Sequence, residues 1–420
     1  MEEEDIFLSD IQKLSDRKVR AESKLYNCLP LPFENARKRF PGFERGSYII
    51  ISANQKVGKS KLTDYLFVYE SLNAVIQKKK IKPHVIYFSL EENPFSKRLA
   101  LYEHLFYTID GNLIDNKVLK STDNDYPCPQ WVLDKLKSPI YKQHIDEYFD
   151  MVEFPLDNKT KQCVSLADDI FNICLKYAEK HGHYNTYKKS VWNEQYKCYL
   201  EEDVISESDP FTWNDEEEIP IVIIDNFANL KVPNGSTKYN EIEKMSKYCI
   251  TLKNLGFIVV GVQHQSQEKE SLVRRQSNDV VPSAEGLADN KSTSKDLTLL
   301  VGLMSPFKYE MTNYMGYDIK MWKDNIRFLY IKEDRENGAV NLCQPLLFIG
   351  EASYFKELPE YTNTEELNKI YDELMAKKQD YERNFHQKDS MLFLAFAKFG
   401  RTLHRNYGKN LSNTRPKRLG

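Results

Sequence analysis

The chain has 420 residues and a formal net charge of −3 at pH 7. That length allows one large α/β domain with additions or two modest domains, and the near-neutral charge excludes a global electrostatic attraction to nucleic acid. The scattered cysteines form no CxxC pair, and no apolar run has the character of a signal peptide or a membrane span. These features predict a cytoplasmic protein with reduced thiols and no membrane contact.

Several short apolar runs predict buried β-strands. They cover residues 48–53, 84–90, 219–225, 256–263, 297–303, 326–332 and 344–350. The runs are rich in Ile, Val and Tyr and lack the period-2 alternation of half-exposed strands, so we expect both faces of the sheet to be covered. Residues 62–80 and 95–107 have apolar positions at helical spacing. This order predicts an α/β fold with a twisted, mainly parallel sheet and helices on both faces.

Additional segments surround this core, which we place at 46–355. Residues 1–45 form a charged lead-in with one helix expected near 6–25. Residues 110–218 separate the second strand from the third. We interpret them as a helical insertion that ends in an exposed acidic loop, residues 201–218.

Residues 356–420 are expected to form a helical extension with a basic tail. Asn363 and Glu366 fit a capping box at the start of a helix, and an apolar stripe follows, made of Leu367, Ile370 and Leu374. Beyond Leu394 the tail carries cations and no acid: Lys398, Arg401, Arg405, Lys409, Arg415, Lys417 and Arg418.

A candidate phosphate-binding loop follows the first strand. Residues 53–60 read ANQKVGKS. A Gly-Lys-Ser tripeptide recurs by chance, but a loop between a buried strand and a helix points backbone N–H groups at an anion. Gly58 would allow close backbone approach, Lys59 would reach the β- and γ-phosphates, and Ser60 would ligate Mg²⁺. The predicted nucleotide-binding residues are Ala53, Asn54, Gln55, Lys56, Val57, Gly58, Lys59, Ser60 and Lys61.

Acidic residues stand at the ends of two other predicted strands. Asp225 ends the run IVIID and is the candidate Walker B carboxylate, a second ligand for Mg²⁺. Glu91 follows the strand that ends in YFSL, where a carboxylate would orient the attacking water. Glu92 is its competitor for that role, and a helix-start acid is the alternative interpretation of both glutamates.

Gln263 stands at the end of a further strand, in VVGVQHQSQ. An amide at that place would sense the γ-phosphate and pass its state to the following loop, residues 265–290. This loop and the residue after it carry Lys269, Arg274, Arg275 and Lys291. They make the loop a candidate DNA contact, and a solvated surface loop is the equally open alternative.

The ordered set of motifs resembles the RecA-like ATPases, and among them the DnaB-type replicative helicases. The phosphate loop of that group often begins with Ala, as here at Ala53. VIYFSLEENPFSKRL (85–99), IVIIDNFANL (221–230) and VVGVQHQSQ (259–267) resemble three further motifs of the family. DNKSTSKDLTLLVGL (289–303) and RFLYIKEDRENGAV (327–340) resemble its closing region, which implies that Lys332 and Arg335 reach the nucleotide of a neighbouring subunit.

The resemblance implies an enzyme: a Mg²⁺-dependent ATPase that acts as a DNA helicase in replication. Its cofactors would be ATP and Mg²⁺, and its partners single-stranded DNA, further copies of itself in a hexameric ring and other replication proteins. The composition is similar to that of phage-encoded relatives, which would place the protein in a host cytoplasm. A RecA/RadA-like recombination or repair ATPase and a non-catalytic nucleotide-binding assembly protein remain as alternatives.

Overall fold

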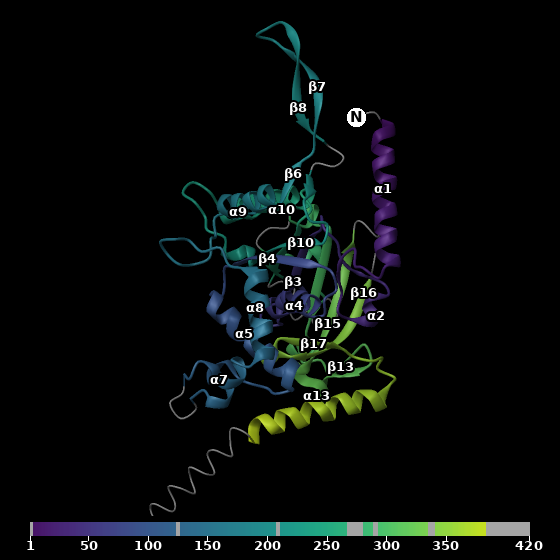
Figure 1. Ribbon diagram of the computed structural model, residues 1–420. Coiled ribbons are helices and arrows are strands. Elements are labelled where there is room, and N and C mark those ends of the chain that lie inside the picture. The colour runs from purple at the N-terminus through teal and green to yellow at the C-terminus, as the bar shows by residue number, and fades with distance from the viewer. Residues whose placement is uncertain are drawn as a thin grey trace, which may run out of the picture.

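The computed structural model describes residues 3–122, 127–206, 211–266, 280–288, 293–334 and 341–383. A nine-stranded sheet forms its centre (Figure 1). In spatial order the strands are β17 (Tyr354–Glu357), β16 (Leu342–Ile349), β15 (Ile326–Asp334), β12 (Leu299–Met304), β3 (Tyr48–Ala53), β11 (Ile258–His264), β10 (Glu218–Asp225), β4 (Lys82–Ser89) and β5 (Val152–Glu153).

The sheet is mainly parallel, as predicted. From β12 to β5 every neighbouring pair runs parallel, whereas β15, β16 and β17 continue the sheet beyond β12 in antiparallel order. Each of the apolar runs predicted to be a strand forms one, with ends that differ by a few residues at most. The carboxyl ends of β3, β4, β10 and β11 therefore meet at one edge of the sheet.

Both faces of the sheet are buried. Successive side chains of a strand point to opposite faces, so that Ile49 and Ile51 join one hydrophobic cluster while Tyr48 and Ile50 join another. The first cluster lies on what we call the α5 face, covered by α3 (Lys59–Thr63), the π-helix η1 (Asp64–Tyr69), α4 (Glu70–Ile76), α5 (Pro94–Asp110) and α8 (Pro139–Met151). The second lies on the α10 face, covered by α9 (Ala167–His181) and α10 (Lys238–Asn254).

The two predicted helices beside the core are present. The first, predicted over 62–80, is formed by α3, η1 and α4 in succession. The second is α5, which begins at Pro94 because proline suits the first helical position and the side chain of Asn93 accepts a hydrogen bond from the Ser96 N–H.

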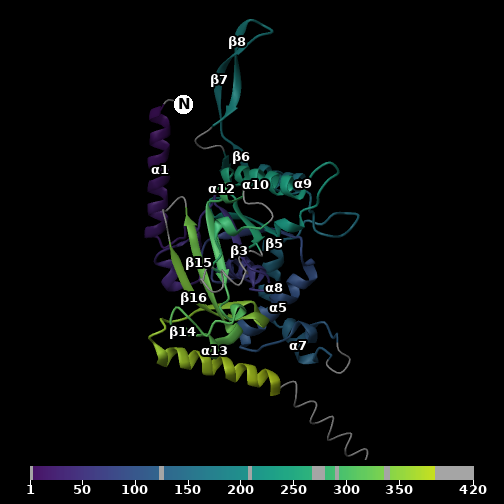
Figure 2. The same cartoon turned by 180° about the vertical axis from the view of Figure 1, so that it is seen from behind.

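The insertion between the second and third predicted strands is helical only in part. It contains α6 (Asn116–Leu119), α7 (Gln130–Leu136), α8, β5 and α9, followed by β6 (Gly182–Tyr184), β7 (Thr186–Asn193), β8 (Cys198–Ile205) and β9 (Phe211–Trp213). Strands β7 and β8 form a hairpin that projects from the body of the protein (Figures 1 and 2).

The prediction of an acidic loop at 201–218 is thus wrong for much of that segment, which β8, β9 and the start of β10 occupy. The hairpin places acidic residues of β8 opposite lysines of β7. Lys188 is paired with Asp203 and its Nζ lies 2.9 Å from Asp203 Oδ2, while Lys189 is the register partner of Glu202. Opposite charges across a strand pair support pairing, which the one-sided acidic composition of the segment conceals.

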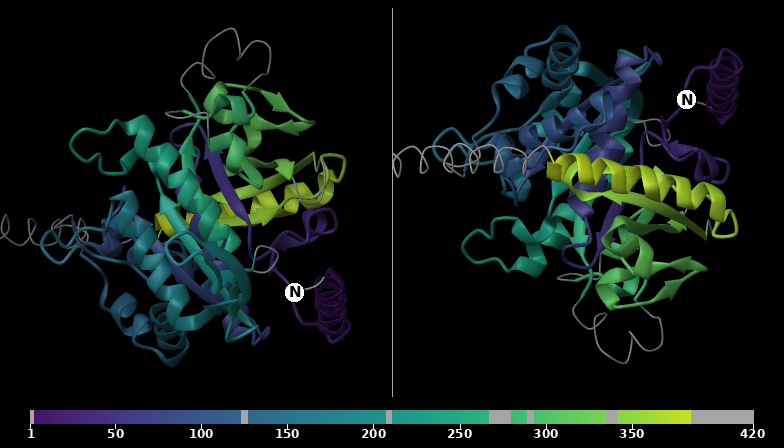
Figure 3. Two further views of the ribbon diagram at one scale, coloured as in Figure 1. Left: turned by 90° about the horizontal axis from the view of Figure 1, so that it is seen from above. Right: turned by 90° about the horizontal axis from the view of Figure 1, so that it is seen from below.

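The two ends of the described chain are helical. Helix α1 (Glu3–Glu22) stands beside the sheet, and the helix over 364–383 crosses the bottom of the molecule (Figure 3). As predicted, Asn363 caps this last helix by accepting from the Glu366 N–H, and the stripe Leu367, Ile370 and Leu374 is buried. The basic tail beyond Leu394 lies outside the described residues.

Short elements complete the chain: β1 (Leu29–Pro30), α2 (Glu34–Arg37), β2 (Gly42–Phe43), η2 (Phe227–Asn229), η4 (Ala284–Gly286), α12 (Thr293–Asp296), η5 (Phe307–Tyr309), β13 (Asn313–Tyr314), β14 (Tyr317–Asp318), α13 (Ile319–Trp322), η6 (Lys323–Asn325) and η7 (Gly350–Ala352). Within the described ranges, no helix combines the length and the apolar character needed to cross a membrane.

Candidate nucleotide-binding site

The predicted phosphate loop connects β3 to α3 at the carboxyl edge of the parallel strands. Gly58 precedes the helix with a left-handed φ of 106°, a conformation that glycine adopts without strain. A Cβ at this position would also lie 3.2 Å from the ring of Phe348. Both the backbone turn and the close approach of this ring therefore favour glycine at position 58.

Residues from outside the loop hold its backbone in place. Arg327 of β15 is buried and donates from Nε to the Val57 carbonyl oxygen at 2.8 Å, and its guanidinium lies 4.4 Å from the centre of the Phe348 ring. Lys308 donates to the Gln55 carbonyl oxygen at 2.9 Å. Burial lowers the pKa of Arg327, and Asp324 acts in the opposite direction. Sequence reasoning missed Arg327, although a cation inside an otherwise apolar strand was a signal for it.

Lys59 begins α3, and its side chain extends to the tip of β11. Its Nζ lies 2.8 Å from Nδ1 of His264 and 3.4 Å from the carbonyl oxygen of Asn54, and the residue is buried. The cation that was predicted to meet the phosphates is thus surrounded by polar atoms of the loop and of β11.

Adjacent residues at the end of β11 point to opposite faces of the sheet. Gln263 pairs in register with Ser52, and its side chain accepts from the Thr293 hydroxyl at 3.0 Å and donates to the Ala288 carbonyl oxygen. His264 pairs with Ala53 and contacts Lys59 on the α5 face. The structure therefore does not bring the side chain of Gln263, the predicted phosphate sensor, to Lys59. Strand alternation restricts the position to one of the two residues, and the structure selects His264.

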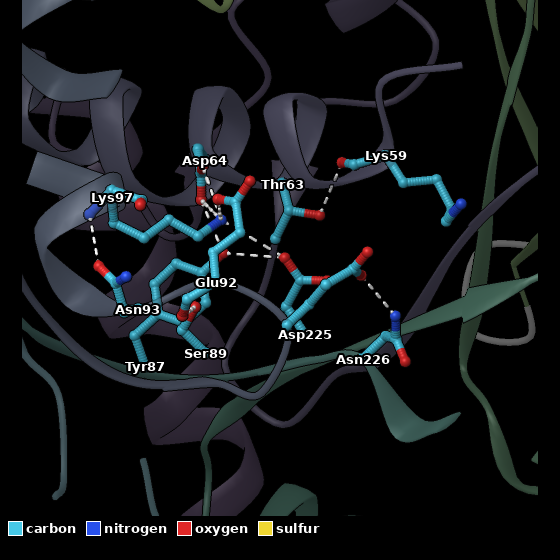
Figure 4. Close-up of polar contacts among 12 residues, drawn as sticks. Lys59, Thr63, Asp64, Tyr87, Ser89, Glu92, Asn93, Lys97, Asp225 and Asn226 are labelled. Carbon is cyan, nitrogen blue, oxygen red and sulfur yellow. Dashed lines mark hydrogen bonds and ion pairs between the residues drawn. The ribbon is translucent and has the colours of Figure 1, made fainter. Parts of the chain in front are cut away.

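Asp225 lies at the tip of β10, on the same face as α3, and is almost fully buried (Figure 4). Its Oδ2 accepts from the Tyr87 hydroxyl at 3.3 Å and from Lys97 Nζ at 3.4 Å. Its Oδ1 is buried, and no group in the described part of the chain forms a hydrogen bond with it. A buried carboxylate oxygen of this kind fits the hydration shell of Mg²⁺, a cation that prefers oxygen ligands.

The two glutamates after β4 differ in their contacts. Glu91 accepts from Asn226 Nδ2 at 2.7 Å, and Asn226 Nδ2 also lies 3.4 Å from His264 Nε2. Glu92 instead lies 3.5 Å from Lys97 Nζ. Contacts therefore connect Lys59, His264, Asn226 and Glu91 in that order across the strand ends. Sequence reasoning did not find His264 or Asn226, which stand next to residues that it did select.

The other predicted site residues have different surroundings. Ser60, the second candidate Mg²⁺ ligand, lies half-buried in the first turn of α3. Lys61 donates to the Gly350 carbonyl oxygen. Lys332 is half-buried in β15, with its Nζ 5.3 Å from the centre of the Tyr330 ring. Arg335 lies outside the described residues, so a role of Lys332 and Arg335 toward a neighbouring subunit stays a prediction.

These residues suit a polyphosphate carried with a divalent cation. The loop offers backbone N–H groups and Lys59 to the phosphate charge, while Ser60 and Asp225 offer oxygen ligands. Glu91, held by Asn226, is a carboxylate beside them that lacks a cation partner within the described residues and is exposed to solvent. The arrangement has the groups needed to bind a nucleotide and to orient a water against its terminal phosphate.

Comparisons with family models and with curated proteins find no match for this chain. Among solved structures, the ATPase domain of one DnaB-like helicase matches with a TM-score of 0.54 and 15% sequence identity, over 84% of this chain and 99% of that one. A DnaB-like replicative helicase, described with its interactions with primase, matches with a TM-score of 0.56 and 15% identity, over 84% of this chain and 66% of that one. The chain therefore has the RecA-like fold of DnaB-type helicase ATPase domains.

Proposed function

We propose that the protein hydrolyses ATP with Mg²⁺ and uses the energy to move on, or remodel, single-stranded DNA, as a ring-forming helicase in replication. The observation that carries this proposal is the meeting of Lys59, Asp225 and Glu91 at one edge of the sheet. A cation for phosphate, a buried carboxylate for the metal and an accessible carboxylate for water are the parts that phosphoryl transfer to water requires.

Each residue has one task in this proposal. Lys59 turns from His264 to the β- and γ-phosphates. Ser60 and Asp225 hold Mg²⁺, which neutralises phosphate charge when it is bound. Glu91, oriented by Asn226, positions the water, and His264 lies where it contacts the terminal phosphate. His264 and Asn226 join Lys59 to Glu91, so a change at the phosphate reaches the water-orienting carboxylate through direct contacts.

The proposal includes an assembly in which the site is shared between subunits. Lys332 or Arg335 of one subunit would approach the nucleotide of the next. Mixing subunits tests this idea, because Arg335→Ala and Lys59→Ala subunits are each inactive alone. Some interfaces of a mixed oligomer pair an intact loop with an intact Arg335, so the mixture should regain ATPase activity. A flat response over all mixing ratios would argue against a shared site.

The DNA contact is proposed for residues outside the described part of the chain. Lys269, Arg274, Arg275 and Lys291 follow β11 in the sequence and are therefore linked to the nucleotide site through that strand. The basic tail beyond Leu394 would add salt-sensitive affinity through phosphate contacts. Charge removal at Lys269, Arg274 and Arg275 should abolish DNA-stimulated ATPase, whereas truncation after Leu394 should lower affinity and leave stimulation at saturating DNA.

The deciding experiment measures ATP hydrolysis with and without single-stranded DNA, together with the oligomeric state of the same sample. Stimulated hydrolysis by a closed ring that unwinds a forked duplex supports the helicase. Stimulated hydrolysis by an open filament without unwinding supports the recombination-type alternative. Nucleotide binding without turnover, in the presence of Mg²⁺ and DNA, supports a nucleotide-binding assembly protein and overturns the proposal.

A further inference from the structure

A buried lysine lies behind the candidate metal ligand. Lys97 of α5 places its Nζ 3.0 Å from Asp64 Oδ2, 3.3 Å from Asp64 Oδ1 and 3.4 Å from Asp225 Oδ2 (Figure 4). Glu92 Oε2 lies 3.5 Å away. The side chain of Lys97 is 3% exposed, and those of Asp64 and Asp225 are 6% and 2% exposed. Lys97 and Asp64 belong to none of the motifs that identified the site.

Burying these three charges is costly unless they compensate one another. The effective desolvation penalty of a buried ion amounts to roughly several kcal/mol, and close pairing with hydrogen bonds is what offsets it. Without the lysine, Asp64 and Asp225 would face each other as two buried carboxylates that share the hydroxyl of Tyr87. Lys97 therefore allows both carboxylates to stay in this small volume.

The contacts of Lys97 are unequal in a way that suits a metal site. It reaches both oxygens of Asp64 but only one oxygen of Asp225. The Tyr87 hydroxyl lies 2.7 Å from Asp64 Oδ1 and 3.3 Å from the same Asp225 Oδ2. Asp225 is thus held by Oδ2, and its buried Oδ1 has no hydrogen-bond partner in the described part of the chain. Asp64 supplies the main counter-charge to Lys97, which leaves Asp225 its own charge for a cation.

The geometry points to Lys97 as a positioning residue that holds Asp225 by one oxygen, with Asp64 as its counter-ion, so that the other oxygen faces the Mg²⁺ of a bound nucleotide. This inference rests on the proposed function, because it concerns the metal of the same site. Lys97 also lies on the helix that directly follows Glu91 and Glu92, so it joins the water-orienting segment to the tip of β10.

The test compares Lys97→Met, Asp64→Asn, the double variant and Lys97→Arg in the full chain. The first readout is Mn²⁺ binding in the presence of ADP, followed by electron paramagnetic resonance, and the second is ADP affinity without metal. Loss of residues behind a metal ligand typically lowers metal affinity about 10- to 100-fold. We expect Lys97→Met to lower Mn²⁺ affinity by at least about tenfold and to leave metal-free ADP affinity unchanged.

The double variant separates positioning from folding. Lys97→Met with Asp64→Asn removes one cation and one anion, so it should recover most of the thermal stability that Lys97→Met loses. It should not recover Mn²⁺ affinity, because neither new side chain carries the charge that holds Asp225 Oδ2. Lys97→Arg should recover part of the affinity. Lys244→Met is the matched control, because Lys244 forms a Lys–Asp pair with Asp168 between α10 and α9.

Wild-type Mn²⁺ affinity in a folded Lys97→Met or double variant would overturn the inference and leave the proposed function intact. A wild-type protein that binds neither ADP nor Mn²⁺ with ADP would instead overturn the proposed function, and this inference with it. A fall in metal-free ADP affinity equal to the fall in Mn²⁺ affinity would show a general loss of the site, which also contradicts a positioning role for the metal ligand.

Discussion

The Nζ of Lys59 lies 2.8 Å from Nδ1 of His264, although the two residues are separated by 205 positions in the sequence. The contact joins the start of α3 to the tip of β11. A phosphate group that reaches Lys59 must therefore also approach His264, and through His264 it reaches Asn226 and Glu91. Three of the predictions below test this connected set of side chains, and the last tests a buried carboxyl of α5.

Lys59→Ala should abolish ATP hydrolysis and weaken ATP binding, because the phosphate charge loses its cation. The loop should keep its conformation, since Arg327 and Lys308 bind its carbonyl oxygens independently of Lys59. The measurement is steady-state ATPase activity together with equilibrium nucleotide binding and thermal unfolding. Lys180→Ala, an exposed lysine of α9, is the control. Near-normal turnover in a folded Lys59→Ala protein would refute the phosphate-loop assignment.

Glu91→Gln should bind ATP normally and slow its hydrolysis by about 100-fold or more, the scale of a lost general base. Glu92→Gln should have a much smaller effect, because Glu92 faces Lys97 and Glu91 faces Asn226. Single-turnover hydrolysis separates the chemical step from binding. The opposite ranking of the two variants would assign the water-orienting role to Glu92, and equal activity of both with wild type would place it elsewhere.

His264→Ala should lower the rate of hydrolysis more than Gln263→Ala does. His264 contacts Lys59 and Asn226, whereas the side chain of Gln263 binds Thr293 and Ala288 on the other face of the sheet. We expect the turnover number of His264→Ala to fall by at least about tenfold, about 1.4 kcal/mol of transition-state stabilisation. The ratio of turnover to KM for both variants checks this. A larger loss in Gln263→Ala would return the sensor role to Gln263.

Glu103→Gln should stabilise the protein at alkaline pH. Glu103 is buried in α5, and burial raises the pKa of its carboxyl from 4.5 to about 8, with Lys61 opposing and Asp115 adding to the shift. Because the folded state binds this proton more tightly than the unfolded state, the contribution of Glu103 to stability is present below about pH 4.5 and is lost as pH rises to about 8.

The glutamine variant cannot ionise, so its advantage over the wild type should grow between pH 5 and pH 8, to roughly 2–4 kcal/mol. Urea unfolding of both proteins at several pH values measures this difference. His104, whose pKa burial lowers to about 4, is present in both proteins, so its own pH dependence cancels in the comparison. Glu179→Gln, at an exposed position of α9, should show no such trend. A pH-independent difference for Glu103→Gln would contradict the raised pKa.

The sequence by itself determined the sheet and the position of the nucleotide-binding motifs. Runs such as 48–53 and 219–225 are apolar on both alternating sets of positions, which only a strand covered on both faces tolerates, and they form β3 and β10. Parallel strands bring their carboxyl ends to one edge, so the loop after β3, Glu91 after β4 and Asp225 at the end of β10 were expected to meet. That expectation came from local pattern and chain order alone.

Only the tertiary structure decided which side chains meet at that edge. Period-2 alternation shows that Gln263 and His264 point to opposite faces, but the helix that covers each face depends on the path of the whole chain. The bond from Arg327 to the Val57 carbonyl oxygen spans 270 positions, and the contact of Lys97 with Asp225 spans 128. No local pattern marks such partners, because buried charges are stabilised by whichever opposite charges folding brings within a few ångströms of them.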